Sequence, residues 1–313
     1  MRVLPPIDLF TSALVTASSI AEPDATQGEA TWSGATNYAL AAEAISTATH
    51  RKYRSLQAAN LNHPLPNYTI GETENDWWVD IGPTNKYAMF DYNRTTTSID
   101  TSPLSVTIAP GQRVDSLALL GMQATQVTIS ATSVLGGGTV YGPEVVSLRR
   151  RSTRTWSDYF FGAFREVPSI ILTDLPQFSD LIVTVEFENA SDNVRVGTCA
   201  IGKSIFLGDI EYNPISDAIN FSEVNRNDFG DAQLTQRRSI PKTTQKVFAD
   251  TDILNSVRQA RTDLNAQVAV WFGLDDEDDP RAEALLILGF YRTWTIDLVG
   301  DDVFEQNIEI EEF

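Results

Sequence analysis

The residue types that most often perform chemistry are few in this chain, and they do not cluster. Its two histidines, His50 and His63, are thirteen residues apart, and neither has the spacing of a metal ligand. Because Arg51 and Lys52 follow His50 directly, we expect this histidine at the solvated end of a strand and not in the role of a catalytic base. The single cysteine, Cys199, excludes an internal disulfide and is expected to be a small buried hydrophobe.

The densest acidic run, residues 275–279, raises the question of a calcium site. An EF-hand loop places its oxygen ligands at alternate positions around a central glycine. Here the charge is continuous and Pro280 follows it, which favours a solvated turn between two buried strands. The chain also has no nucleophile elbow, no phosphate-binding loop and no H-E-x-x-H zinc motif. We therefore expect no catalytic residue, no metal and no cofactor.

Two aromatic-rich segments supply the candidates for binding. In the first, Trp77 and Trp78 are adjacent in a run with strand character, and successive strand side chains point to opposite faces. At most one of them can enter the same small core, so the other is expected at a domain contact, a subunit contact or a ligand. The same segment supplies three further candidates, Trp32, Tyr38 and Tyr53.

The second segment joins a basic cluster to an aromatic cluster. Its members are Arg149, Arg150, Arg151, Arg154, Trp156, Tyr159, Phe160, Phe161 and Phe164. Arginine and aromatic side chains are enriched in protein interfaces, so one hypothesis makes this segment a contact surface. The alternative is a basic loop that leads into a core strand. As a contact surface, the arginines would find complementary charge on another copy of this acidic chain, for instance at 275–279 or 301–302.

Composition limits the classes of partner. The 313 residues carry 42 acidic and 23 basic side chains, a net charge of −19, which argues against nucleic-acid binding and against docking on an anionic membrane. A hydrophobic content of 42% is enough to build cores, so the chain is not expected to be disordered. No segment is long and apolar enough to span a bilayer or to act as a secretory signal, so we expect synthesis in the cytoplasm and no membrane insertion.

Short strands separated by turns predict a mainly β protein with four regions. These are a leader and linker over 1–29, a small aromatic β module over 30–82, an antiparallel β-sandwich or jelly roll over 83–208, and a C-terminal mixed β-rich domain over 209–313.

Three segments of the last region have patterns of their own. Residues 213–246 are polar and irregular, without a strand pattern. Residues 251–266 have the spacing of one amphipathic helix with an acidic or threonine N-cap. Residues 307–313 alternate apolar and acidic side chains, which predicts an edge strand guarded by charge.

Residues 30–120, about a third of the chain, resemble two kinds of known protein. The order of a tryptophan, a tyrosine, the Y-R-S-L strand at 53–56, an asparagine, a proline and a closing tryptophan is similar to small chitin-binding-type carbohydrate modules. The run W-V-D-I-G-P-T-N-K-Y-A-M-F-D at 78–91 resembles a junction in virion proteins from the tail tip or baseplate of tailed bacteriophages. The opening at 32–38 also matches that group, but its Gly-Asp turn is absent and A-A-E stands at 41–43.

The resemblance implies a structural component of a phage tail tip or baseplate. Such a chain would be made in the host cytoplasm, would reside in the virion tail, and would bind other virion tail proteins and copies of itself. Its interfaces would be non-covalent, and it would not be an enzyme. A carbohydrate-binding adhesion or receptor-binding protein that contacts a host cell-surface glycan is the alternative, with weak or absent sugar affinity expected because the Gly-Asp turn is missing. A polysaccharide-cleaving enzyme is the third hypothesis, because a catalytic carboxylate pair is defined only by its separation in space, about 5 to 9 Å.

Overall fold

The computed structural model describes most of the 313 residues. The described ranges are 1–10, 13–68, 71–93, 95–151, 155–190, 193–211, 214–226, 228–273, 280–298, 300 and 302–313, the side chains of 280 and 281 excepted. The chain is mainly β with several antiparallel sheets, which confirms the predicted fold class. It divides into two compact units, one made of Met1–Pro6 with Ile201–Phe313 and the other of Ile7–Ala200.

The predicted leader is shared between the two units. Strand β1 (Arg2–Leu4) pairs with strands of the first unit, whereas β2 (Val15–Ser18) joins a sheet of the second. A short 3-10 helix, η1 (Ala25–Gln27), follows in the linker, where the Asp24 side chain accepts a hydrogen bond from the Thr26 backbone N–H. Both ends of the leader therefore take part in the fold.

The aromatic module of the second unit consists of two small antiparallel sheets. One contains β4 (Glu43–Ser46), β5 (Arg51–Ser55) and β7 (Trp78–Pro83), and the other pairs β3 (Asn37–Tyr38) with β6 (Asn60–Leu61). Their core is Tyr38, Ala44, Tyr53 and Trp78. Directly after β7, the 3-10 helix η3 (Asn85–Phe90) leads into the next sheet, and five of its six residues are buried.

A five-stranded antiparallel sheet forms the larger part of the second unit. Its order is β12 (Gly138–Ser147), β11 (Gln126–Ser133), β16 (Ile182–Glu188), β9 (Leu104–Ile108) and β2. A three-stranded sheet contains β15 (Ile170–Leu172), β10 (Ser116–Leu120) and β18 (Thr198–Gly202), and two-stranded pairs join β8 (Ser98–Asp100) to β17 (Val194–Val196) and β13 (Arg149–Arg150) to β14 (Arg165–Glu166). Strands β9, β11 and β16 alternate buried with less buried residues, as expected for strands with one face on a core.

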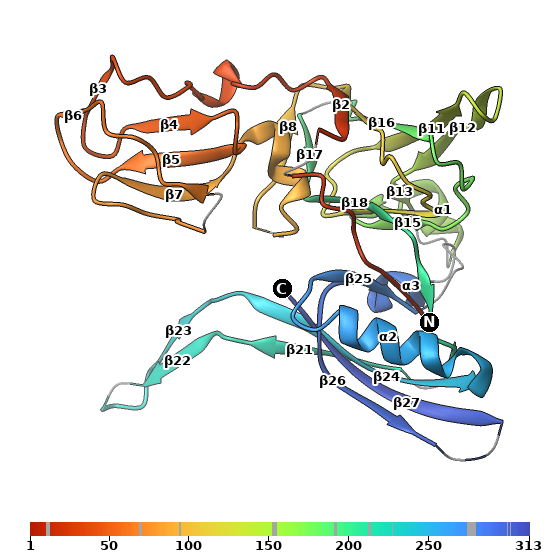
Figure 1. Cartoon of the computed structure of the whole chain (residues 1–313). Helices are drawn as coiled ribbons and strands as arrows, with labels where there is room; N and C mark the ends of the chain where they lie inside the picture. Colours follow the sequence, from red (N-terminus) through yellow and green to blue (C-terminus); the bar gives the residue numbers. More distant parts are fainter. Residues whose placement is uncertain are drawn as a thin grey trace. The chain divides into compact units, whose positions relative to one another are not determined.

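The first unit is an eight-stranded sheet covered by a helix (Figure 1). The sheet contains β19 (Ile205–Phe206), β1, β25 (Ala269–Phe272), β26 (Ile287–Asp297), β27 (Val303–Glu312), β24 (Ser239–Asp250) and β20 (Asp209–Ile210), with β21 (Ile215–Asn220) also paired to β24. Helix α2 (Leu254–Asp263) buries Val257 and Ala260 in the same core as Trp271 and Trp294. A second short helix, α3 (Pro280–Leu285), precedes β26.

Three local expectations for this unit are wrong. The helix lacks the expected side-chain N-cap, because the 3-10 turn η4 (Thr251–Ile253) starts it and Asp250 makes no capping hydrogen bond. Strand β27 is not an edge strand, because β26 and β24 pair with it on both sides. Its acidic side chains face cations on those neighbours, since Glu309 pairs with Lys242 of β24 and Glu311 with Arg292 of β26.

The third wrong expectation concerns residues 213–246, whose described residues are mostly in paired strands. Strand β21 pairs with the first half of β24, and beyond it β22 (Glu223–Arg226) pairs with β23 (Ala232–Thr235). Together they form a long antiparallel ribbon, here called the arm (residues 215–244), which extends away from the sheet of its unit (Figure 1). Every residue of β22 and β23 is exposed, so the apolar alternation that marks a half-buried strand is missing.

Candidate functional site

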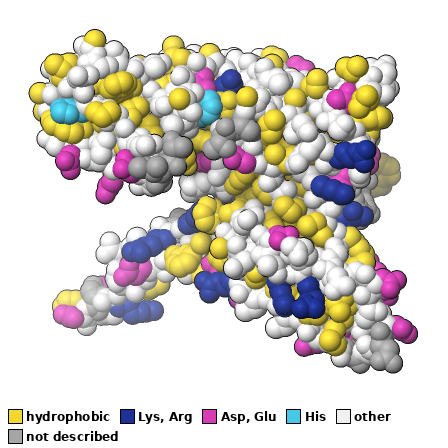
Figure 2. All heavy atoms as spheres, viewed as in Figure 1, with side chains coloured by type: hydrophobic (Ala, Val, Ile, Leu, Met, Phe, Trp, Pro, Cys, Tyr) yellow, Lys and Arg dark blue, Asp and Glu magenta, His cyan; other side chains and the backbone are white. Residues whose placement is uncertain are grey.

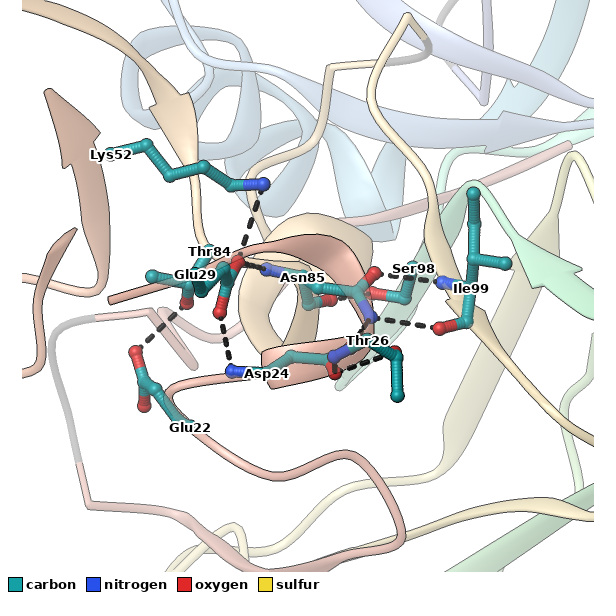
Figure 3. Close-up of polar contacts among 9 residues, drawn as sticks. All are labelled: Glu22, Asp24, Thr26, Glu29, Lys52, Thr84, Asn85, Ser98 and Ile99. Atoms are coloured by element: carbon teal, nitrogen blue, oxygen red, sulfur yellow. Dashed lines mark hydrogen bonds and ion pairs between the residues drawn. The ribbon is translucent and has the colours of Figure 1, made fainter. Parts of the chain in front are cut away.

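The linker and the end of β7 meet in a buried polar cluster, here called the junction. Its side chains are Glu22, Asp24, Glu29, Lys52, Thr84, Asn85 and Ser98 (Figure 3). The cluster lies at the end of β7, where the chain passes from the aromatic module to η3. Thr84 and Asn85 of the 78–91 motif take part in it.

Asn85 is the centre of the junction, and all its polar groups have partners. Its side-chain amide donates to the Asp24 carboxylate (2.6 Å) and to the Ile99 carbonyl (2.8 Å), while its side-chain oxygen accepts from the Ile99 N–H (2.9 Å). Its backbone N–H donates to Glu29 (2.7 Å), and its carbonyl accepts from the Ser98 hydroxyl (2.6 Å). Asn85, the first residue of η3, therefore connects this helix to the linker and to β8.

Two buried glutamates complete the junction. Glu29 accepts hydrogen bonds from the backbone N–H groups of Asp24 and Asn85, and the Lys52 ammonium lies 3.2 Å from its carboxylate. Glu22 accepts from the Thr84 hydroxyl at 2.8 Å. A buried carboxylate is costly unless it is paired and hydrogen-bonded, and both glutamates meet that condition.

Glu22 also binds His50, which stands directly before β5, at a strand end as predicted, but is less solvated than predicted. The His50 Nδ1 atom lies 3.0 Å from Glu22, and the imidazole stacks on the Tyr87 ring at 3.7 Å. His50 therefore forms one wall of the junction, between the largely buried side chains of Glu22 and Tyr87.

The electrostatics of the junction favour an ionised Asp24. Burial by itself raises the pKa of this carboxyl group, but hydrogen bonds from Thr26 and Asn85 outweigh burial and lower the pKa below its ordinary value of 3.8. The charged form is thus the one that the fold stabilises.

An open pocket of about 310 Å³ lies beside the junction. Glu43, Lys52, Asn85 and Thr96 are among its lining residues. Lys52 already pairs with Glu29, and the polar groups of Asn85 are already engaged. Glu43 pairs with Arg54 at 2.9 Å, so these three residues are engaged within the protein and we assign the pocket no ligand.

The aromatic candidates of the module separate into core and surface. Tyr38, Tyr53 and Trp78 are buried, and Trp78 donates its indole N–H to the His63 carbonyl at 3.0 Å. A fully buried ring cannot stack on a sugar, so the expectation that Tyr53 is available to a ligand is wrong.

Trp77 and Trp32 are the half-buried members of the module. Trp77 stacks on the His63 ring, with centroids 3.6 Å apart and an interplanar angle of 7°. The two adjacent tryptophans therefore do have different environments, Trp78 in the core and Trp77 near the surface. Trp32 packs on the edge of the same core.

The second candidate segment forms a small exposed structure, here called the projection (residues 149–151 and 155–166). It contains β13, helix α1 (Trp156–Phe161) and β14. Thr155 and Asp158 form a capping box that starts α1, because each side chain accepts the other's backbone N–H. None of the helix residues is buried, and the exposed fraction reaches 80% at Trp156 and 86% at Phe161.

The arginines at 149–151 of the projection have two different roles. Arg151 donates to the Tyr159 carbonyl at 2.6 Å and lies 4.2 Å from the centre of the Phe164 ring, so it braces α1. Arg149 and Arg150 are exposed on β13, where Arg149 stands opposite Glu166. Arg154 lies outside the described residues, and so does the acidic run 275–279.

The sequence interpretation missed the junction and the arm. The partners of Asn85 come from sequence positions 24, 29 and 99, and no local pattern connects them. The one sequence feature that pointed to Asn85 was the junction motif itself. Among the described residues, no three histidine, cysteine or carboxylate side chains are close enough together to hold a metal ion.

None of the helices in the described part of the chain combines the length and apolar character needed to cross a membrane. A search with protein-family models and a search of curated proteins both found no match to this chain.

Proposed function

We propose that this chain is a structural component of the tail tip or baseplate of a tailed bacteriophage, where it binds other virion tail proteins through non-covalent interfaces. The resemblance at 30–120 supports this proposal, and the junction gives the matching motif an architectural role. Asp80, in that motif, accepts a hydrogen bond from Arg51 at 2.8 Å, and Asn85 fastens the linker.

The observation that carries the proposal is the projection. Trp156, Phe160 and Phe161 are exposed on a capped helix, so their rings contribute to no hydrophobic core. Large aromatic side chains are preferred anchors of protein interfaces. Arg149 and Arg150 beside them suit an acidic partner surface. We therefore assign the projection to contact with a neighbouring tail protein.

The test is gene replacement with the triple variant Trp156→Ser, Phe160→Ser and Phe161→Ser. Val134→Ser with Leu135→Ser is the matched control, because these two residues are as exposed but lie at the β11–β12 hairpin tip. Purified particles are analysed by mass spectrometry for the chain and by electron microscopy for tails. We expect to find the wild-type chain and the control variant in complete tails. We expect the triple variant to be absent from particles or the tails to be incomplete. Absence of the wild-type chain from purified particles would contradict the proposal.

Adhesion to a host glycan is the second candidate function. It is favoured by the half-buried Trp77 and Trp32, which leave part of their rings at the surface of a module that resembles carbohydrate-binding ones. A glycan array with the wild type and Trp77→Ala separates the two. Saturable binding that Trp77→Ala abolishes would favour adhesion over a purely structural role.

A further inference from the structure

The arm exposes apolar side chains that nothing in its own unit covers. Ile215, Phe221, Val224 and Leu234 are between 50% and 69% exposed. At its outer end the arm is only two strands wide, β22 and β23. An isolated two-stranded ribbon is marginally stable in water, and a third strand or a packed face is needed to stabilise it.

The apolar side chains of the outer arm share one face. Val224 stands directly opposite Leu234, and Ala232 stands opposite Arg226. Glu223 and Asn225 point to the other face, where Glu223 pairs with Arg237 at 2.8 Å. Among the described residues, β22 pairs only with β23, so its outer edge is open to another strand.

The arm is neutral, whereas the chain as a whole is strongly acidic. Residues 215–244 carry four of the 42 acidic and four of the 23 basic side chains, so the whole net charge of −19 lies elsewhere. Figure 2 shows side chains of both signs and apolar side chains interspersed along the arm. Copies of so acidic a chain repel one another, and a contact made through the neutral arm adds little to that repulsion.

We infer that the arm joins two copies of this chain by antiparallel addition of β22 to β22 of the partner about a two-fold axis. In such a pair, the residue at the two-fold axis stands opposite the same residue of the second copy, and this residue defines the register. In the register centred on Val224, the row Leu234–Val224 continues into the same row of the second copy, so four apolar side chains cross a four-stranded sheet.

The neighbouring registers are less favourable. Centring on Glu223 or on Arg226 places like charges directly opposite each other, which destabilises a strand pair. Centring on Asn225 places Val224 opposite the partner's Arg226 and breaks the apolar row. In the register centred on Val224, Glu223 faces the partner's Asn225, so no like charges are opposed.

The experiment is disulfide trapping of the full chain with Val224→Cys. Opposed residues of antiparallel strands have Cα atoms about 5 Å apart, a separation that a disulfide spans. The control is Glu223→Cys, which lies two residues out of register with its own copy, about 8 Å away and beyond disulfide reach. The native thiol does not compete, because Cys199 is fully buried and burial raises its pKa to about 12.

We expect covalent dimers from Val224→Cys under mild oxidation and few from Glu223→Cys. In sedimentation velocity, Val224→Lys should raise the dimer dissociation constant about tenfold or more, because it opposes two ammonium groups. Equal trapping of both cysteine variants, no trapping of Val224→Cys, or its trapping to a different protein would overturn the inference.

The outcome is independent of the proposed tail function. A chain that dimerises through the arm but is absent from particles keeps this inference and contradicts the tail proposal. A chain that is monomeric at every concentration but present in tails contradicts this inference and keeps the tail proposal.

Discussion

The aromatic module and the projection use the same residue types for opposite purposes. Trp78 has no exposed surface, meets Tyr38 edge to face at 5.0 Å and donates its indole N–H to the backbone. Trp156 is 80% exposed, and its ring neighbours are Tyr159 and Phe160 of the same short helix. Aromatic content alone therefore does not identify a binding surface. The rings can bind a partner only where they are not already buried in a hydrophobic core.

The largest effect expected from this contrast is on stability. Trp78→Ala should lower the free energy of unfolding of the second unit by about 3 to 5 kcal/mol, because it leaves a cavity in a small core. Trp156→Ala should change it by less than about 0.5 kcal/mol, because the ring packs on no core. Calorimetry of both variants measures the difference, and equal losses would remove the distinction between the two regions.

The junction should be second in effect. Asn85→Ala removes the side-chain partner of the Ile99 N–H and carbonyl and one of the hydrogen bonds to the Asp24 carboxylate, which should cost about 1 to 3 kcal/mol. Asn37→Ala, at an exposed position of β3, is the matched control and should be nearly neutral. Urea denaturation monitored by tryptophan fluorescence compares the two, and an equally small effect of Asn85→Ala would show that the junction does not hold the unit together.

Acid should weaken the junction through Asp24. The folded pKa of Asp24 lies below 3.8, so its contribution to stability is complete above pH 3.8 and is lost as the pH falls through the folded pKa. Asp24→Asn should remove this part of the acid dependence. Thermal melting between pH 5 and 2.5 tests it, and an unchanged pH profile in the variant would contradict the role given to Asp24.

The smallest effect should come from the exposed arginines of the projection. Arg149→Glu with Arg150→Glu should slow association with the partner several-fold at low salt, and the difference should fade as salt rises. Arg151 is left unchanged because it braces α1. Association rates over a salt series measure the effect, and a salt-independent loss would mean that the substitutions disturb the fold.

The sequence was informative where one element decides the outcome. Short strands separated by turns predicted a mainly β protein, and β9, β11 and β16 are such strands, each with alternating burial. The apolar run around Cys199 predicted its burial. Each of these features depends on local periodicity or on local turn chemistry.

The sequence was misleading where distant partners decide. The acidic alternation of β27 suggested an edge, yet Glu309 and Glu311 pair with Lys242 and Arg292 on the flanking strands. Strands β22 and β23 of the arm show no alternation of buried and exposed residues, because all of their residues are exposed. Asn85 depends on partners from three other segments, which a single sequence does not place together.

In the aromatic module the rings of Tyr38, Tyr53 and Trp78 are buried in a core, whereas we propose that a partner protein covers those of the projection. Hydroxyl-radical footprinting with mass spectrometry measures both tryptophans in one experiment, on the free chain and on purified particles. The account predicts that Trp78 is protected in both states and that Trp156 is oxidised readily in the free chain but protected in particles. Equal oxidation of Trp156 in the two states would contradict it.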